Sequence, residues 1–511
     1  MDVHPYVSEC ERYLEAASYD PMLSEAYLRD LVDYLSLPAG QWPQGDYIRE
    51  KGPFAWSYAW NGRGEILSRT HSDVEAYKRA PSATGEGELP QILFLAGYSS
   101  PSWLNTIGHQ FHVDPYFYLR HMSFRPSVQV DSYAEPTLPS ASGHVLKLNI
   151  PTVGHIDPQV QYPCEDIQTT RQRCISLLKQ SFRDRMVKPK VGSSIVRRLY
   201  VHDWKRFTFE QEVSMCLLRQ GGKFTVIVWT DAGGEDCDPV LPLCDLPAFQ
   251  SFKYDFQCCP TILRRPGMDA RRKLSSTVQS IQSFQTTQTF NLLHRVYGQT
   301  LKAECVQSDP FYILSEIYTF AAAAENQFLN MIDQILTERV DSLMLDPDDA
   351  KCPKTSDIQY DRSILDAHRN QIKGIITFLT AHDDPAWFQP SQHNASSETT
   401  AARNSLLRDF QHLETRVKAL ILRCERAMEI IMNNASLAEA RLTNNQSKEL
   451  ASLTRMTTLV TILYVPLSFV SSFFGMNFKE FGQGGLSLWV WAAVSLPVII
   501  SSAFLLRRRL L

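Results

Sequence analysis

The sequence lacks the short motifs that commonly mark an enzyme. It contains no Gly-rich phosphate loop, no G-x-S-x-G nucleophile motif and no H-E-x-x-H zinc motif. Acidic and histidine residues are plentiful, but none is spaced to nominate a catalytic pair. These absences argue against a catalytic protein, so we expect neither an enzymatic activity nor a bound cofactor.

The chain also lacks a disulfide framework and a strong charge of one sign. Its eleven cysteines are scattered, Cys258 and Cys259 are the only close pair, and no C-x-x-C spacing occurs. An odd, dispersed set is typical of reduced thiols in a cytosolic domain. The net charge of −4 offers no basic field for nucleic acid. Met1–Asp20 carries no hydrophobic signal and is acidic, which argues against a leader peptide.

Two long uncharged stretches lie near the C-terminus. Met456–Phe474 contains no charge, and at about 1.5 Å per residue it is long enough to cross a hydrocarbon core of about 30 Å. Leu486–Leu506 is a second such stretch. Arg455 precedes the first, Arg507–Arg509 follow the second, and positive residues at membrane ends stay cytoplasmic. The sequence therefore predicts an integral membrane protein with two spans and both termini in the cytoplasm, and we expect the plasma membrane to hold it.

The first of these stretches carries a polar stripe. Hydroxyl side chains and Gly475 recur every seven residues, a spacing that places them on one helix face. The stripe has two interpretations: the hydroxyls bond carbonyls of their own helix and allow close packing, or they line a water-filled pore. The serines of the second stretch share no single face, which favours a pore-lining first helix and a lipid-facing second helix. The candidate pore-lining residues are Thr454, Thr457, Thr461 and Ser468.

Gly475, Met476 and Asn477 follow the first stretch directly. A glycine that ends a helix in the left-handed conformation leaves the last carbonyls at the mouth, where the negative pole of the helix dipole favours a cation. Asn477 adds an amide oxygen, and several copies around an axis would form a ring of neutral oxygens. Such a ring suits Mg²⁺ held through its water shell. Gly475 and Asn477 are thus candidate metal-binding residues, and Met476 is expected to pack under the loop.

The run Met456–Phe478 resembles the first transmembrane helix of the CorA magnesium transporters. The matching features are the Met-Thr start, the segment Pro466-Leu467-Ser468, and Gly-Met-Asn followed by phenylalanine. The resemblance is strongest over the C-terminal residues and extends to the helices from Asp309 onward. It implies a homopentamer with a funnel-shaped cytoplasmic domain, an outer selectivity site for hydrated Mg²⁺ at Gly-Met-Asn, and uptake down the electrochemical gradient. It also implies that Mg²⁺ bound between cytoplasmic domains closes the pore.

Four parts are predicted along the chain, giving an α+β/α membrane protein. Residues 1–90 form a helical and irregular extension, and residues 91–304 form an α/β cytoplasmic domain. Residues 305–453 form a helical stalk, and residues 454–511 form the two-span transmembrane domain. Strands are expected near 92–95, 145–150, 195–201, 212–218 and 224–229, the last two joined as a hairpin. The stalk helices are expected over 311–340, 356–380 and, without interruption, 402–474.

The last stalk helix carries apolar side chains at alternating spacings of four and three, which is a heptad seam. Packing within one subunit and packing across subunits are both open for this seam. The residues of the seam are Leu406, Phe410, Leu413, Val417, Leu420, Cys424, Ala427 and Ile431.

Two other functions remain open beside Mg²⁺ transport. One is a membrane-anchored interaction module that does not conduct, because Ala451, Thr454 and Thr457 stand where family members carry a large apolar gate. The other is a transporter of Zn²⁺, Co²⁺ or Ni²⁺. The first stretch contains no Cys or His for a softer metal, which favours Mg²⁺.

Overall fold

The structure is a computed structural model of the chain. It describes residues 4–19, 28–38, 53–60, 65–79, 91–122, 138, 143–157, 166–183, 191–220, 223–233, 255–263, 290–345, 354–381, 387, 397–474, 479, 485 and 487–510. The chain divides into two compact units, Met1–Glu425 and Arg426–Leu511. The division falls within one long helix, α14 (Ser397–Phe474).

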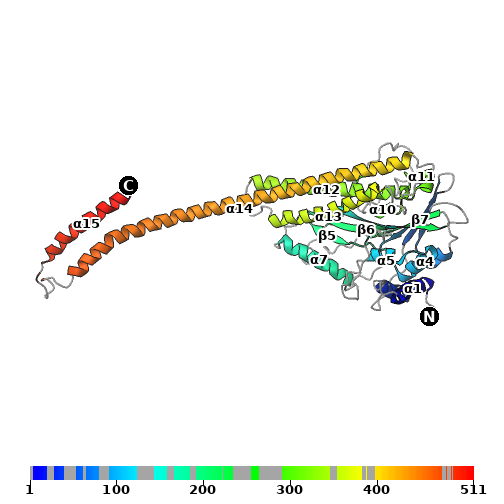
Figure 1. Cartoon of the computed structure of the whole chain (residues 1–511), viewed down its shortest axis with the longest axis horizontal. Coiled ribbons are helices and arrows are strands. Elements are labelled where there is room, and N and C mark those ends of the chain that lie inside the picture. Colours follow the sequence, from blue (N-terminus) through cyan, green and yellow to red (C-terminus); the bar gives the residue numbers. More distant parts are fainter. Residues whose placement is uncertain are drawn as a thin grey trace. The chain divides into compact units, whose positions relative to one another are not determined.

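The first unit is built on an eight-stranded sheet with the order β2-β1-β3-β7-β6-β4-β8 and β5 beside β6 (Figure 1). Strands β3 and β7 are parallel, and the other neighbouring pairs are antiparallel. The strands are β1 (Ala55–Trp60), β2 (Ile66–His71), β3 (Gln91–Ala96), β4 (Val145–Asp157), β5 (Arg198–Val201), β6 (Arg206–Gln220), β7 (Lys223–Thr230) and β8 (Asp255–Cys258).

The strands expected from residue 91 to residue 230 are all present. Strands β4 and β6 extend beyond the predicted ranges, and they pair antiparallel along most of their length. Strands β6 and β7 pair antiparallel as far as Gln220 and Lys223, which confirms the predicted hairpin. The α/β character of this part of the chain is therefore confirmed.

The structure corrects the irregular extension expected over residues 1–90. Strands β1 and β2 lie inside that range, and β1 pairs with both β2 and β3. Trp56, Tyr58 and Trp60 alternate along β1 and are all buried, and the Tyr58 hydroxyl donates a hydrogen bond to the His294 carbonyl at 2.9 Å. These aromatic residues belong to a strand buried along its whole length, where aromatic side chains are favoured.

Helices cover both faces of the sheet, with α12 and α13 on one face and α4, α5 and α7 on the other (Figure 1). The helices of the N-terminal half are α1 (Pro5–Tyr19), α2 (Arg29–Leu35), α3 (Val74–Arg79), α4 (Pro101–Phe111), α5 (Pro115–His121) and α7 (Ile167–Arg183). Helices α4 and α5 each begin with proline, preceded by Ser100 and Asp114, whose side chains accept helix N–H groups. A capping side chain followed by proline thus marks the start of both helices.

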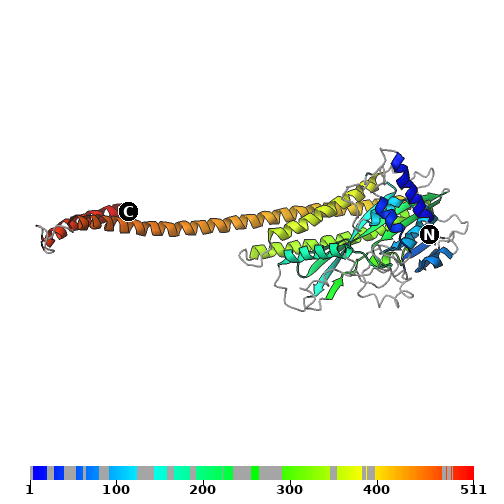
Figure 2. The same cartoon turned by 90° about the horizontal axis from the view of Figure 1, so that it is seen from below.

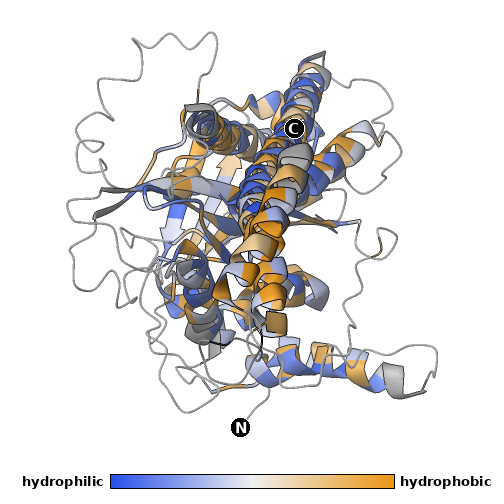
Figure 3. Cartoon of the chain, turned by 90° about the vertical axis from the view of Figure 1, so that its left-hand side faces the viewer, coloured by the Kyte–Doolittle hydropathy of each residue, from blue (hydrophilic) through white to orange (hydrophobic). Residues whose placement is uncertain are grey.

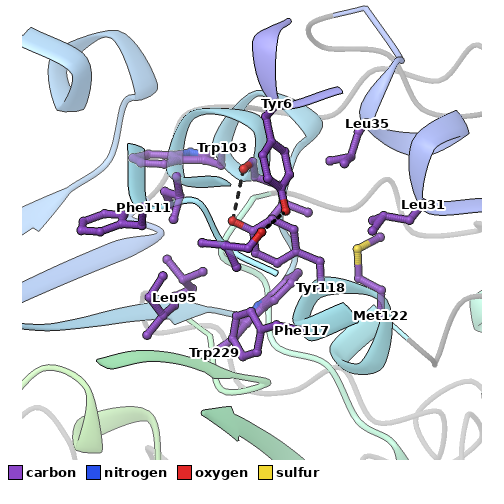
Figure 4. Close-up of a cluster of buried hydrophobic side chains, with 14 of the residues drawn as sticks. Tyr6, Leu31, Leu35, Leu95, Trp103, Phe111, Phe117, Tyr118, Met122 and Trp229 are labelled. Atoms are coloured by element: carbon purple, nitrogen blue, oxygen red, sulfur yellow. Dashed lines mark hydrogen bonds between the residues drawn. The ribbon is translucent and has the colours of Figure 1, made fainter. Parts of the chain in front are cut away.

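A large apolar core joins these N-terminal helices to the sheet (Figure 4). Tyr6 from α1, Trp103 from α4 and Trp229 from β7 are each at most 1% exposed and belong to it. The Tyr6 hydroxyl donates to the Val113 carbonyl at 2.7 Å, so the buried phenol keeps a hydrogen-bond partner. The described residues 4–19 and 28–35 are thus part of the folded unit.

Most of the C-terminal half is helical. Its elements are α10 (Phe290–Leu293), α11 (Ala303–Ser308), the 3₁₀ turn η4 (Tyr312–Leu314), α12 (Ser315–Leu345), α13 (Thr355–Thr380), α14 (Ser397–Phe474) and α15 (Leu488–Leu510). The predicted stalk helices correspond to α12, α13 and α14. The Asp309 carboxylate accepts the Phe311 and Tyr312 N–H groups at 2.8 and 3.2 Å, so it starts the helical turn η4 that leads into α12.

The heptad seam of α14 packs within one subunit. Its side chains from Leu406 to Cys424 are at most 6% exposed in the single chain. Phe410 contacts Tyr318 of α12 edge-on, with ring centroids 6.4 Å apart. A seam covered by its own subunit has no apolar surface left for a second copy there, which decides between the two alternatives for this part of α14.

Gly97 is a position where an alanine should be strongly destabilising. Its φ is +66°, and a Cβ atom would lie 2.1 Å from the Ser193 carbonyl oxygen. The left-handed backbone alone should cost a Gly97→Ala variant about 1–3 kcal/mol, before the clash is counted. Gly374 of α13 is the matched control, because nothing lies within 4 Å of its Cβ position. Gly374→Ala should raise the thermal midpoint measured by tryptophan fluorescence, and Gly97→Ala should lower it by several degrees.

Candidate pore segment and ionic core

The C-terminal part of α14 is long and apolar enough to cross a membrane, and only 6% of that stretch is buried (Figure 3). Within the described residues it is the one helix that meets this criterion. The apolar helix Leu488–Phe504, within α15, is shorter. An uncovered apolar surface of this size marks contact with lipid or with other protein chains.

The three residues of the Gly-Met-Asn motif, Gly475, Met476 and Asn477, lie outside the described residues. Helix α14 ends at Phe474, directly before the glycine that was expected to end it. The continuous helix expected over 402–474 is confirmed, and it begins five residues earlier, at Ser397. Pro466 lies inside this helix.

All four candidate pore-lining residues, Thr454, Thr457, Thr461 and Ser468, are exposed on α14. The Thr454 hydroxyl donates to the Leu450 carbonyl at 2.8 Å, and the Thr458 hydroxyl donates to the Thr454 carbonyl at 2.7 Å. These bonds to the helix's own carbonyls use the hydroxyl hydrogen. They leave lone pairs on the oxygen that can accept from the water shell of an ion. The two interpretations of the stripe are therefore compatible for these hydroxyls.

Helix α15 runs back alongside the C-terminal end of α14 (Figure 2). The Trp491 indole donates to the Ser471 hydroxyl at 3.3 Å. Ser495 and Ser502 are seven residues apart and are 3% and 7% exposed, whereas Ser501 is exposed. This agrees with the expectation that the serines of this helix share no single face, because Ser501 is exposed while Ser495 and Ser502 are buried.

Strand β6 carries a row of polar side chains that connect it to α12 and α13. Arg206 and Glu210 contact these helices directly, and Thr208 reaches α13 through His202, which precedes the strand. Arg206, Thr208 and Glu210 alternate along the strand, and we call these three residues the β6 ladder. The Arg206 guanidinium donates to Glu338 of α12, with one N–H···O distance of 3.2 Å. This first step lies at the surface, since Glu338 is half exposed.

The second step of the β6 ladder is buried. The Thr208 hydroxyl lies 3.0 Å from His202 Nε2, and His202 Nδ1 lies 2.8 Å from the Asp361 carboxylate of α13. Arg339 of α12 bonds the same carboxylate and donates to the His202 carbonyl at 2.9 Å. Burial acts to raise the pKa of Asp361, but His202 and Arg339 hold it below its usual value. Asp361 is therefore an ionised, fully paired group in the interior.

The third step is a buried histidine between two carboxylates. His368 of α13 lies 3.1 Å from Glu210 through Nε2 and 2.9 Å from Glu325 of α12 through Nδ1. The Phe328 ring stacks on the imidazole, with centroids 4.2 Å apart. Burial acts to lower the pKa of His368, but the Glu325 and Glu210 carboxylates outweigh it and raise this pKa to about 10. The imidazolium thus stays charged at neutral pH.

A further buried ionic group surrounds Asp231, at the end of β7. Arg197 Nε and Nη2 donate to its two carboxylate oxygens at 2.6 and 2.9 Å, and the Glu212 N–H donates at 2.7 Å. His121 Nε2 lies 3.3 Å away, and its ring stacks on Trp229. Burial lowers the pKa of His121, whereas Arg197 and His121 keep the pKa of Asp231 below its usual value. The carboxylate holds α5, β6 and β7 together.

Sequence reasoning missed both ionic groups, although β6 carried a usable signal. The segment Arg206–Glu210 alternates charged or hydroxyl residues with Phe207 and Phe209, which is the period of a strand with two different faces. The partners lie far along the chain, as with His202 and Asp361, which are separated by 159 residues. Among the described residues no group of three His, Cys, Asp or Glu side chains is placed to hold a metal ion.

Residues 283–508 match a family model described as "CorA-like Mg2+ transporter protein". The match covers α12, α13, α14 and most of α15. This part of the chain is therefore similar to the CorA family, and the match covers less than half of the chain. The expected α/β domain and long C-terminal helix are both present in the described residues.

Two solved structures align with most of this chain. The complete structure of the CorA magnesium transporter from Methanocaldococcus jannaschii is 9% identical, with a TM-score of 0.33, and covers 89% of this chain and 98% of its own. The full-length CmaX protein is 10% identical, with a TM-score of 0.35, and covers 90% and 98%. The comparison with curated protein sequences gave no match.

Proposed function

We propose that this chain takes up Mg²⁺ across a membrane, down its electrochemical gradient, as a pore built from several copies of α14. The observation that carries the proposal is that a face of exposed hydroxyl side chains on α14 is followed directly in the sequence by the Gly-Met-Asn motif. The exposed hydroxyl face of α14 ends at Phe474, and the Gly-Met-Asn motif follows at the next residue. A cation would meet carbonyl and amide oxygens first and hydroxyl oxygens afterwards, all of them ligands suited to hydrated Mg²⁺.

In this mechanism the hydrated ion is held at a ring of Gly475 carbonyls and Asn477 side chains. It then passes Ser468, Thr461 and Thr454, whose hydroxyl oxygens accept hydrogen bonds from the ion's water molecules. Thr457 faces the same path. The membrane potential, negative inside, drives the movement. The protein acts as a channel, so the ion is cargo and no cofactor takes part.

The assembly and placement also belong to this proposal. The apolar part of α14 is almost uncovered by its own chain, which favours contact with lipid and with other copies. By the resemblance the assembly is a homopentamer with two spans per subunit, and α15 is the second span. Both termini then lie in the cytoplasm, and internal Mg²⁺ bound by the cytoplasmic domains closes the pore. The domain boundaries expected near residues 305 and 454 stay predictions.

The test is Mg²⁺-dependent growth and uptake in cells that lack their own Mg²⁺ transporters, with wild type beside Asn477→Ala. The wild type should restore uptake, and Asn477→Ala should reduce it at least about tenfold, because a preorganised oxygen ligand is removed from the selecting ring. Asn445→Ala is the matched control, since Asn445 is an exposed asparagine of α14 outside the apolar stretch. It should transport like the wild type at equal membrane levels.

Other outcomes would separate the alternatives. If the protein took up Zn²⁺, Co²⁺ or Ni²⁺ but no Mg²⁺, the proposed pore would stand and only the identity of the transported ion would change. A wild type that reaches the membrane and carries none of these ions would favour a membrane-anchored module that does not conduct. Equal transport by wild type and Asn477→Ala would overturn the selecting ring.

A further inference from the structure

The interface between β6 and the helix pair α12–α13 is ionic, whereas the neighbouring interface is apolar. Helix α12 buries Leu329, Ile332 and Leu336, each less than 1% exposed. The two inner steps of the β6 ladder interrupt this apolar surface. They bring His202–Asp361 and Glu210–His368–Glu325 between the sheet and the two helices.

Burying these groups is not the most stable way to join a sheet to two helices. Glu210, Glu325 and His368 have side chains at most 4% exposed, so all three have lost their water. A buried ion pair seldom gains more than the water it gives up, and apolar residues of similar volume often hold an interface at least as firmly. Buried ionic groups are best known for fixing a register or for switching between two states.

Ionic contacts also break differently from apolar ones. The distances of 2.9 and 3.1 Å at His368 leave no room for a gradual slide, since such hydrogen bonds fail within about an ångström. Water that enters can hydrate the freed charges, whereas separated apolar surfaces gain nothing from it. An interface with an ionic strip therefore opens there first.

We infer that the inner steps of the β6 ladder form a latch, at which the helix pair α12–α13 separates from the sheet as a unit while both parts remain folded. The contacts of α14 follow from this. Arg423 of α14 pairs with Asp333 of α12, and Glu425 of α14 pairs with Arg362 of α13 at 2.8 Å. Release of the latch thus moves the helices that hold the first part of α14. Only the role of the latch in transport rests on the proposed function, whereas its existence rests on the contacts described above.

The test compares hydrogen exchange in the purified full chain with an apolar latch variant. The variant carries Glu210→Met, Glu325→Met and His368→Phe together, so the new ring can stack on Phe328. Arg198, which loses Glu210, is half exposed and can be hydrated. In the wild type the backbone amides of α13 should exchange their hydrogens through a local opening, and therefore faster than the amides of the apolar core strands. In the variant their exchange should slow by about tenfold or more.

The control replaces both members of a surface ion pair by methionine. Lys302 and Glu398 pair with side chains 63% and 47% exposed, and Lys302→Met with Glu398→Met should leave α13 exchange unchanged. Equal or faster exchange of α13 in the folded latch variant would overturn the latch. His368→Gln gives a second variant, which keeps a polar group but loses the charge, and its α13 exchange should be faster than in the wild type.

Transport gives a separate readout. If the wild type carries Mg²⁺, the apolar latch variant should transport with a weakened response to internal Mg²⁺, because its helix pair no longer separates from the sheet. An unchanged response would remove the latch from regulation. If the wild type carries no ion, the proposed function fails, and the exchange experiment still decides whether the latch exists.

Discussion

Replacing Asp231 by alanine should lower the free energy of unfolding of the first unit by about 3–5 kcal/mol. The carboxylate is fully buried and accepts hydrogen bonds from Arg197 and the Glu212 N–H, and His121 Nε2 lies 3.3 Å away. Its removal takes the main counter-charge from Arg197, whose side chain is only 10% exposed. A charge left in a low-dielectric site without its pair is among the costliest single changes in a protein core.

The measurement is denaturant unfolding of the purified full chain, followed by tryptophan fluorescence, with Asp333→Ala as the control. Asp333 pairs with Arg423, but both side chains are more than a third exposed, so its loss should cost less than about 1 kcal/mol. Similar midpoint shifts for the two variants would show that the Asp231 group is not a buried ionic centre. A large shift for Asp231→Ala alone would establish it.

Stability should fall as the pH rises through about 10, because of His368. The folded pKa of this residue is about 10, which lies above the unfolded value of about 6.5. A base whose pKa is raised by folding contributes its full stability below the unfolded pKa and loses it as pH rises through the folded pKa. The loss is on the order of a few kcal/mol, and most of it should appear between pH 7 and pH 10.

Thermal unfolding from pH 6 to pH 10 tests this, with His368→Gln and His412→Gln beside the wild type. His368→Gln should be less stable at pH 7 and should lack the alkaline decline. His412 is exposed on α14, so His412→Gln should follow the wild-type curve. An alkaline decline of equal size in His368→Gln would mean that another group causes it and that His368 is not held as an imidazolium.

The helical half of the molecule could be predicted closely from the sequence. The start signal at Asp309, the heptad positions from Leu406 and the absence of Pro or Gly from residue 402 to residue 465 are local features, and α12, α13 and α14 follow them. Hydrophobic periodicity acts over neighbouring turns, so it can be read without knowing the fold. The apolar stretch of α14 was identified in the same way.

Which surface covers the heptad seam could not be predicted. A seam requires an apolar partner, and helices of the same chain or of another copy satisfy the pattern equally well. Contacts such as Phe410 with Tyr318 decide for the same chain. Strand β1 was missed for a similar reason, because Trp56, Tyr58 and Trp60 lack the apolar–polar alternation of a strand with one exposed face.

The sequence by itself determined a C-terminal part that resembles the CorA transporters, with an apolar helix bearing hydroxyl side chains and a Gly-Met-Asn motif, because these depend on composition and short-range spacing. Only the tertiary structure decided that a buried ionic layer joins the sheet to α12 and α13. His202 meets Asp361 across 159 residues, and His368 meets Glu325 across 43. A buried charge is tolerated only where its partner lies within hydrogen-bond distance, and that distance is set by how the strands and helices pack.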